Sequence, residues 1–383
     1  MLDFFFSLNV VTFEINLENT FVRFEKYSSK LDISRSLIRI FAKDFSNDFK
    51  TVADKKKILF IINPKSGIQS KKNIPSVVDK RIDRNRYDLS VEFTAYAGHA
   101  SEIAASAVKN GYDVVVAVGG DGTINEVATA LVHTDTALGV VPCGSGNGFA
   151  RHLGIPMDVT KAIDFINRAE PVTIDYGKLN GQPFFCACGV GFDALVSSDF
   201  AKSGSRGLAT YIQKTLIDWV KYKPEVYEVV LDSVKKSYKA FLIACGNASQ
   251  YGNNAYITPF ASMRDGLLSV SILEPFTAVE VPFVVTQLFS NALDKNSHTT
   301  TVTARQITIK RKNAGPVHYD GEPAMMDAEL RIETVPDGLK VLAAPGWDGT
   351  CKPLPLYKQF FDVIGTLPAP VIPLPKLKLP LRE

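Results

Sequence analysis

A valine-rich run that stops at a pair of glycines is the feature that most constrains the fold of this chain. Residues 112–126 read Tyr-Asp-Val-Val-Val-Ala-Val-Gly-Gly-Asp-Gly-Thr-Ile-Asn-Glu. The apolar stretch predicts a buried parallel strand, and Thr123 and Glu126, at capping-box spacing, predict a helix that begins at Thr123. Glycines at such a junction let backbone N–H groups approach a ligand, and the helix N-terminus favours a phosphate. By itself, the junction is equally compatible with a plain turn in which Asp121 makes a local hydrogen bond.

Two further loops of the same kind favour the functional interpretation. Residues 58–67 read ILFIINPKSG and residues 138–151 read LGVVPCGSGNGFAR, so each passes from an apolar strand into a small, polar loop. The carboxyl ends of parallel strands share one edge of a sheet, where ligands bind. We therefore expect the three loops to form one nucleotide-phosphate site that contains the carboxylate of Asp121.

Composition limits the class of protein. A chain of 383 residues is long enough for two domains, and its net charge of +3 gives no reason to expect nucleic acid as a partner. Its five cysteines are scattered without zinc spacing, which favours reduced thiols, as in the cytoplasm. The apolar segment at residues 4–11 is too short to span a bilayer. Residues 1–54 are predicted to be an N-terminal extension, to which we assign no function.

The order of patterns predicts two domains and a tail. Residues 55–171 alternate between strand and helix, which is typical of a doubly wound α/β domain. Residues 172–347 begin with a hairpin at Asn180-Gly181 and predict a mostly antiparallel β-sandwich. Its strands are expected at 227–231, 237–245, 267–273, 299–310, 317–319 and 328–333, and its helices at 208–222 and 279–293. Residues 348–383 are rich in proline and are expected to form an extended tail.

These loops and several later motifs, in this order, resemble the diacylglycerol kinase catalytic-domain family, which includes sphingosine, ceramide and bacterial lipid kinases. The resemblance covers about residues 55–346 and rests on Asn63-Pro-Lys-Ser-Gly67, Gly119-Gly-Asp-Gly-Thr123, Gly144-Ser-Gly-Asn147, Asp175-Tyr-Gly, Gly189-Val-Gly-Phe-Asp193, Met263-Arg-Asp265-Gly-Leu and Asp320-Gly-Glu322. It implies an N-terminal α/β domain like that of NAD kinases, a C-terminal antiparallel β-sandwich, and an active site in the cleft between them.

The resemblance also implies ATP-dependent, Mg²⁺-dependent phosphorylation of a lipid hydroxyl. Asp121 is expected to act as the general base or orienting partner of the acceptor, and Asp193 to contact the lipid head group. Asp320 and Glu322 are expected to face the cleft and help hold Mg²⁺, and Asp265 to join a metal site, as in bacterial relatives. ATP would be held by the first three loops, through Asn63, Ser66, Gly119, Gly120, Gly122, Thr123, Gly144 and Asn147. The alternative for Asp193, Asp265 and Asp320 is that each is an ordinary turn residue.

Two departures from the family pattern bear on the acceptor and on the phosphates. Bacterial diacylglycerol kinases usually carry Asn-Asp in the third loop, whereas Gly148 follows Asn147 here, as in the sphingosine kinase form. Ile68 stands where a lysine is expected after the first loop, so that Lys65, Lys71 or Lys72 would have to substitute.

Diacylglycerol is the default acceptor, and a sphingoid base is the alternative within the family. An NAD kinase shares the Gly-Gly-Asp-Gly signature but fits the motifs around Asp193 and Asp320 poorly. A nucleotide-binding regulatory protein with an inactive site is the non-enzymatic alternative. As a lipid kinase the protein would be cytoplasmic and would associate peripherally with the inner face of the membrane. Residues 197–223 or the tail from 352 would make this contact. A homodimer is compatible with this prediction.

Overall fold

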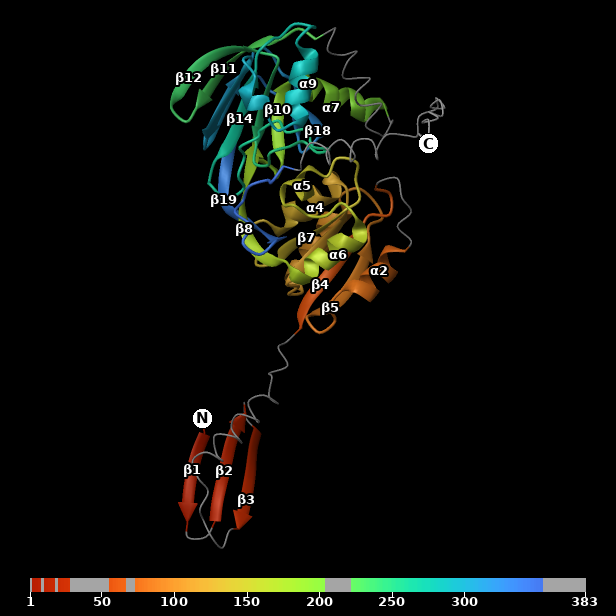
Figure 1. Cartoon of the computed structure of the whole chain (residues 1–383), viewed down its shortest axis with the longest axis vertical. Coiled ribbons are helices and arrows are strands. Elements are labelled where there is room, and N and C mark those ends of the chain that lie inside the picture. The colour runs from red at the N-terminus through yellow and green to blue at the C-terminus, as the bar shows by residue number, and fades with distance from the viewer. Residues whose placement is uncertain are drawn as a thin grey trace, which may run out of the picture. The chain divides into compact units, whose positions relative to one another are not determined.

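The computed structural model describes residues 2–7, 10–17, 20–27, 55–66, 73–203 and 222–353, with side chains for 55–66, 73–198 and 222–353. The chain divides into two compact units, Met1–Lys55 and Lys56–Glu383. The first contains an antiparallel sheet in the order of the chain, formed by β1 (Leu2–Ser7), β2 (Val10–Leu17) and β3 (Thr20–Tyr27) (Figure 1). The N-terminal extension therefore has regular structure that we did not predict.

The second unit begins with the predicted α/β domain. Four parallel strands lie in the order β5-β4-β6-β7, and β6 is buried at every position. Its elements are β4 (Lys56–Ile62), α2 (Ile74–Arg81), β5 (Tyr87–Phe93), α3 (His99–Lys109), β6 (Val114–Gly119), α4 (Asp121–Leu131), β7 (Ala137–Pro142), α5 (Gly148–His152) and α6 (Val159–Arg168). A strand buried on both faces explains why the run before Gly119 carries no polar side chain.

The start of α4 corrects one prediction. The helix begins at Asp121 rather than Thr123, because Gly120 is the N-cap and its carbonyl accepts the first helical hydrogen bond, from the Ile124 N–H at 3.0 Å. Glu126 does not close a capping box. Its carboxylate instead accepts hydrogen bonds from backbone N–H groups at the start of α3. Asp121, Gly122 and Thr123 therefore all lie in the first turn of α4.

The remainder of the second unit is the predicted sandwich (Figure 1). A six-stranded antiparallel sheet, in the order β15-β14-β13-β10-β17-β18, packs its apolar face against β12, β11, β16 and β19. The elements are β8 (Glu170–Leu179), β9 (Gln182–Phe184), β10 (Ala187–Gly191), α7 (Phe192–Ser203), β11 (Glu225–Leu231), β12 (Val234–Ala240), β13 (Leu242–Gly246), β14 (Leu268–Leu273), α9 (Val281–Phe289), the 3₁₀ turn η1 (Leu293–Lys295), β15 (Thr299–Ala304), β16 (Gln306–Lys310), β17 (Gly315–Tyr319), β18 (Glu322–Met326) and β19 (Glu329–Ala343).

Two strands that we predicted as continuous are each divided between the sheets. The run at 237–245 becomes β12 and β13, and the run at 299–310 becomes β15 and β16, with a single residue between the strands in each case. Alternation is interrupted at both breaks, because the apolar residues 240–242 follow one another and the polar pair Arg305-Gln306 shifts the phase. We did not use this signal. The hairpin prediction is confirmed, since Asn180 and Gly181 have φ of 47° and 84°, as a primed turn requires. The predicted helix at 208–222 lies almost entirely outside the described residues.

Strand β19 joins the two domains through one sheet. It pairs antiparallel with β16 and β8, and parallel with β7, where Val341 lies opposite Leu138. A register shift between Val335 and Leu339 lets the strand change partners along its length. The sheet therefore runs without interruption through β12-β11-β16-β19-β7-β6-β4-β5 (Figure 1).

Candidate active site

The structure brings together the three loops that we predicted from the sequence. They follow β4, β6 and β7 at the carboxyl edge of the parallel strands. The second and third loops touch through their backbones, because a Cβ atom on Gly144 would lie only 2.6 Å from Cα of Gly120. The first loop is tied to α4 by a hydrogen bond of 2.9 Å from Nδ2 of Asn63 to Oγ1 of Thr123.

Asp121 links the second loop to the third. Its Oδ2 accepts a hydrogen bond from the Asn147 N–H at 2.9 Å, and its Oδ1 accepts one from the Gly148 N–H at 3.0 Å, at the start of α5. Burial raises the pKa of Asp121 to about 6 against the effect of these two bonds, and the nearby charge of Asp320 raises it further. A carboxylate with such a pKa is ionised at neutral pH and can still take a proton from a substrate.

Glu322 brings an acidic side chain from the sandwich to the same place. Its Oε1 lies 3.5 Å from the position that a Cβ atom would occupy on Gly122, in the first turn of α4. Glu322 is exposed, and its carboxylate makes no hydrogen bond or ion pair with the residues that the structure describes. The sandwich domain therefore brings a carboxylate beside Gly122, the residue that follows Asp121 in α4.

Gly122 differs from the other glycines of these loops. At positions 119, 120, 144, 146 and 148, a Cβ atom would lie 3.2 Å or less from another protein atom. At Gly122 the nearest atom is Oε1 of Glu322, at an ordinary contact distance. Packing therefore does not require glycine at this position, and the space beside it is open to a ligand.

Asp320 holds the two domains together. Its Oδ1 accepts hydrogen bonds from the backbone N–H groups of Cys186 and Ala187 at 2.7 and 3.2 Å. Its Oδ2 accepts one from the Phe185 N–H and one from Nδ2 of Asn125 in α4, both at 2.8 Å. A carboxylate offers about four acceptor positions, and all of them are used here. The geometry favours a positioning role, and the assignment of Asp320 as a Mg²⁺ ligand stays a prediction.

Two predicted nucleotide contacts have structural partners. The Asn147 side chain accepts from the Gly144 N–H at 2.9 Å and donates to the Gly144 carbonyl at 2.8 Å, so it shapes the third loop. Ser66 donates to the Asn63 carbonyl at 3.2 Å, and the Lys65 N–H donates to the Asn63 side chain at 2.9 Å. Gly67, Ile68, Lys71 and Lys72 lie outside the described residues.

Asp193 belongs to a buried polar cluster at the start of α7. Its Oδ2 accepts hydrogen bonds from the Tyr251 hydroxyl at 2.7 Å and from Nε2 of His318 at 2.9 Å, and its Oδ1 accepts one from the Ala194 N–H at 2.8 Å. Asp193 and His318 are 7% and 2% exposed. Nδ1 of His318 has no hydrogen-bond partner in the part of the chain that the structure describes, which assigns the imidazole proton to Nε2.

This cluster is connected to Asp121. The carbonyl oxygen of Tyr251 lies 2.8 Å from the position of a Cβ atom on Gly148, the residue whose N–H donates to Asp121. Sequence reasoning missed Tyr251 and His318. His318 lies two residues before Asp320 on β17, which was the only available signal for it.

Asp265 lies in a turn, where its Oδ1 accepts a hydrogen bond from the Leu267 N–H at 3.0 Å. Burial raises its pKa, and the charge of Asp175 adds to the shift. Among the described residues, no three His, Cys, Asp or Glu side chains are arranged to hold a metal ion. The metal site at Asp265 therefore stays a prediction.

A buried histidine anchors the far end of α5. His152 is 1% exposed, and its Nδ1 accepts a hydrogen bond from the Ser249 N–H at 3.0 Å, so Nε2 carries the proton and donates to the Gly349 carbonyl at 3.0 Å. Burial lowers its pKa to about 4. The imidazole is therefore neutral and structural at physiological pH.

A cavity of about 200 Å³ lies at the opposite edge of the sheet, at the amino ends of β4, β6 and β7. Lys56, Asp113, Asp135, Thr173 and Lys340 are among its lining residues, and none of the predicted site residues contributes to it. Lys340 donates to Asp135 there, so the charges are partly satisfied within the protein. The cavity gives no support to a second site.

No helix in the described part of the chain is both long and apolar enough to cross a bilayer. The predictions of a cytoplasmic location, peripheral membrane association and a homodimer stay predictions. The surfaces that we predicted at 197–223 and in the tail lie almost entirely outside the residues with described side chains.

Comparison with known proteins agrees with the resemblance seen in the motifs. Residues 57–179 match the diacylglycerol kinase catalytic domain, and residues 186–343 match the YegS C-terminal NAD kinase β-sandwich-like domain. A diacylglycerol kinase of Bacillus subtilis is 29% identical over 273 residues, which are 70% of this chain and 90% of that protein. A Chromohalobacter salexigens protein named "probable lipid kinase YegS-like" is 28% identical over 69% of this chain and 86% of its own length.

Solved structures show the same fold. A crystal structure of a diacylglycerol kinase from Bacillus anthracis superposes with a TM-score of 0.60 at 20% identity, covering 76% of this chain and 98% of that one. The two domain matches together cover residues 57–179 and 186–343 of this chain. The chain therefore belongs to the family that joins a diacylglycerol kinase catalytic domain to a YegS-type β-sandwich domain.

Proposed function

We propose that this protein is an ATP- and Mg²⁺-dependent lipid kinase that converts diacylglycerol to phosphatidate. The observation that carries the proposal is the position of Glu322 beside Gly122, next to Asp121. Glu322 of the sandwich thus lies at the open first turn of the helix that begins with Asp121, and transfer of a phosphoryl group between two bound substrates uses charged groups from both sides of such a site.

The first turn of α4 suits the phosphates of ATP. Backbone N–H groups at a helix N-terminus attract anions, and the missing side chain at Gly122 leaves space for a phosphate to approach them. The bond from Asn63 to Thr123 holds the first loop beside this turn. The exposed carboxylate of Glu322 fits Mg²⁺, which prefers oxygen ligands and would offset the charge of the transferred group.

Asp121 suits the role of general base. A new bond forms between the acceptor hydroxyl oxygen and the γ-phosphorus of ATP, while the bond from that phosphorus to the β–γ bridging oxygen breaks. The hydroxyl proton passes to Asp121, and ADP leaves. The two backbone hydrogen bonds fix the carboxylate in one orientation, and its raised pKa suits it to accept a proton near neutral pH.

The surroundings of Asp193 leave room for one polar group of the acceptor. Three donors already bind this carboxylate, which leaves about one acceptor position. One position suits a single hydroxyl of diacylglycerol and equally one N–H of the ammonium group of a sphingoid base, so this count does not choose between the two acceptors. Local packing explains why glycine follows Asn147, because any side chain at position 148 would collide with the Tyr251 carbonyl. The departure from Asn-Asp is therefore no strong argument for a sphingoid base.

A sphingoid base remains the second candidate, because the sequence of the third loop resembles the sphingosine kinase form. The test is incubation of the full chain with labelled ATP, Mg²⁺ and a panel of diacylglycerol, monoacylglycerol, sphinganine and ceramide. Labelled phosphatidate that disappears in the Asp121→Asn variant is the expected result. Labelled sphinganine phosphate would support the second candidate. ATP binding without any labelled lipid would instead indicate a nucleotide-binding regulator.

A further inference from the structure

Helix α9 has an unusual composition for its exposed position. Its nine residues read VPFVVTQLF and carry no charge, yet only Val284 is buried. Phe283 is 69% exposed and Val279, just before the helix, is 79% exposed. A helix with this many apolar side chains and no charge normally lies in a protein core or in lipid, and this one is too short to span a bilayer.

The inner side of α9 packs close to the proposed acceptor site. Val284 belongs to the same apolar cluster as Phe192 and Val196, which flank Asp193 at the start of α7. Leu288 and Tyr251 pack against this cluster, and the Tyr251 hydroxyl donates to Asp193. One apolar cluster therefore connects α9 with the residues on either side of Asp193.

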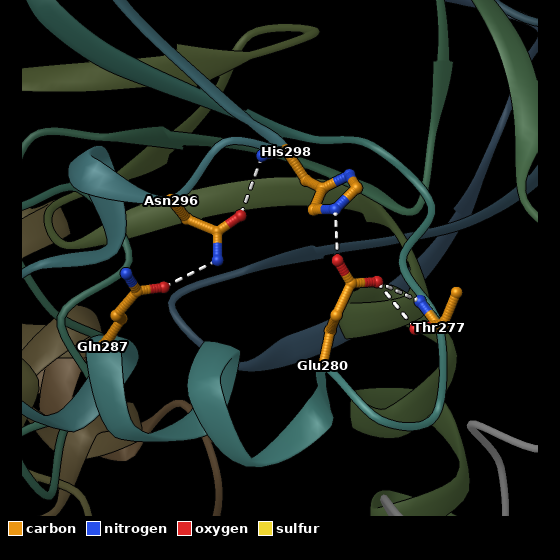
Figure 2. Close-up of polar contacts among 5 residues, drawn as sticks. All are labelled: Thr277, Glu280, Gln287, Asn296 and His298. Carbon is orange, nitrogen blue, oxygen red and sulfur yellow. Dashed lines mark hydrogen bonds and ion pairs between the residues drawn. The ribbon is translucent and has the colours of Figure 1, made fainter.

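Polar contacts near both ends of α9 tie the helix to the segment before β15, as Figure 2 shows. Glu280 accepts hydrogen bonds from the N–H and the hydroxyl of Thr277 at 2.7 and 2.8 Å, and from Nε2 of His298 at 2.9 Å. The bonds from Thr277 and His298 lower the pKa of Glu280 to about 2. Near the other end, Asn296 donates to the Gln287 side chain at 2.6 Å. Glu280 and Gln287 are thus directed toward the segment before β15, whereas Thr286 is exposed and its hydroxyl donates to the Pro282 carbonyl at 2.7 Å.

We propose that the α9 face, defined as Val279, Pro282, Phe283 and Val285, inserts into the bilayer that carries the acceptor lipid. The proposal rests on the proposed function, because diacylglycerol resides in the membrane and its reacting hydroxyl must reach the site of Asp121 from there. The helix would lie in the interface with its exposed side chains among the acyl chains. No lysine or arginine occurs between residues 275 and 292, so this contact depends on apolar area and not on anionic lipid.

The first test measures binding of the full chain to phosphatidylcholine vesicles that contain diacylglycerol. Replacing both Val279 and Phe283 by serine should weaken binding by about tenfold or more, because neither side chain can then bury its apolar area among the acyl chains. Phe260→Ser is the matched control, because this phenylalanine is 66% exposed outside the α9 face. The control should bind within about twofold of the unchanged protein, and the difference between variant and parent should persist at high salt.

The second test separates docking from catalysis. The double variant should phosphorylate a short-chain, water-soluble diacylglycerol at the parent rate and lose activity only on vesicles. In Phe283→Trp, tryptophan emission should shift to the blue with vesicles and be quenched by brominated lipid, a readout that needs no turnover. Unchanged vesicle binding of the double variant would overturn the proposal. A change in oligomeric state with unchanged vesicle binding would also overturn it, and would assign the face to a second copy. Absence of any kinase activity in a parent that still binds through α9 would count against the proposed function alone.

Discussion

The Gly122→Ala substitution tests whether glycine is needed at this position for stability of the fold or for binding of the nucleotide. A Cβ atom there meets only Oε1 of Glu322, at 3.5 Å, and the backbone of Gly122 is not left-handed. Because the residue lies in the first turn of α4, Gly122→Ala should stabilise the protein by about 0.5–1 kcal/mol or leave it unchanged. The expected melting temperature is unchanged or raised by roughly 2 °C.

The same substitution should impair nucleotide binding. A methyl group would fill the space through which a phosphate approaches the start of α4. The phosphate would then lose one charge-assisted hydrogen bond from a backbone N–H, which weakens the binding free energy by about 1.5–3 kcal/mol. The KM for ATP should therefore rise by about 10- to 100-fold. Initial rates at saturating acceptor and calorimetric titration with a non-hydrolysable ATP analogue measure this effect, and thermal melts measure stability in parallel.

Gly144→Ala provides the comparison. Its Cβ atom would lie 2.6 Å from the Gly120 backbone, so this variant should lose about 1–3 kcal/mol of stability together with ATP binding. The reasoning is refuted if Gly122→Ala binds ATP as well as the parent, because the open space would then not belong to the nucleotide. A fall of several degrees in its melting temperature would show that the fold needs glycine there.

Three further predictions concern titratable groups. Because burial lowers the pKa of His152 to about 4, its contribution to stability is complete above pH 6.5 and falls by up to roughly 3 kcal/mol as the pH drops to 4; urea melts should show this loss in the parent and not in His152→Asn. The contribution of Asp121 to stability depends on pH in the opposite direction, because its pKa is raised from 3.8 to about 6. It stabilises the fold at low pH, and this contribution is lost as the pH rises through 6. As a base, Asp121 should make kcat/KM fall about tenfold from pH 7 to pH 5, and Asp121→Asn should lower kcat by about 10²- to 10⁴-fold with ATP still bound. His318→Leu should raise the KM for the lipid by about tenfold at unchanged KM for ATP, and His318→Gln should restore it, because glutamine can donate to Asp193.

Each of these predictions has a distinct contrary result. Parallel pH profiles of stability for the parent and His152→Asn would remove His152 as the titrating group. A kcat/KM that stays constant between pH 7 and pH 5 would show that Asp121 is not the base. Equal kinetics of His318→Leu and His318→Gln would show that the hydrogen bond to Asp193 does not position the acceptor.

The sequence predicted the parts of the fold that local patterns determine. The apolar run before Gly119 and the glycines after it are enough to predict a strand, a loop and a helix, because these signals lie within one short segment. The alternating valines, threonines and phenylalanines of residues 10–27 also carried a strand signal, which we did not use. The two divided strands escaped prediction because we read the interruptions of alternation at 240–242 and 305–306 as part of one strand; alternation alone does not record which sheet a residue joins.

The site was harder to predict from the sequence, because its hydrogen bonds join residues that are far apart along the chain. The carboxylate of Asp121 accepts hydrogen bonds from backbone N–H groups of the next loop. Nearly every residue has such a group, so the sequence does not reveal which one is the donor. The same holds for Asp320, which accepts from three backbone N–H groups as well as Asn125. Tyr251 and His318 are far apart in the chain, and only tertiary packing places both on Asp193.

The strand shared by the two domains has a consequence for how the protein unfolds. β19 lies beside both β7 and β16, so neither domain can melt without exposing an unpaired strand of the other. We therefore expect a single cooperative calorimetric transition for the second unit, not two steps. A fragment that ends after the first domain would leave the edge of β7 bare, and such a fragment should self-associate.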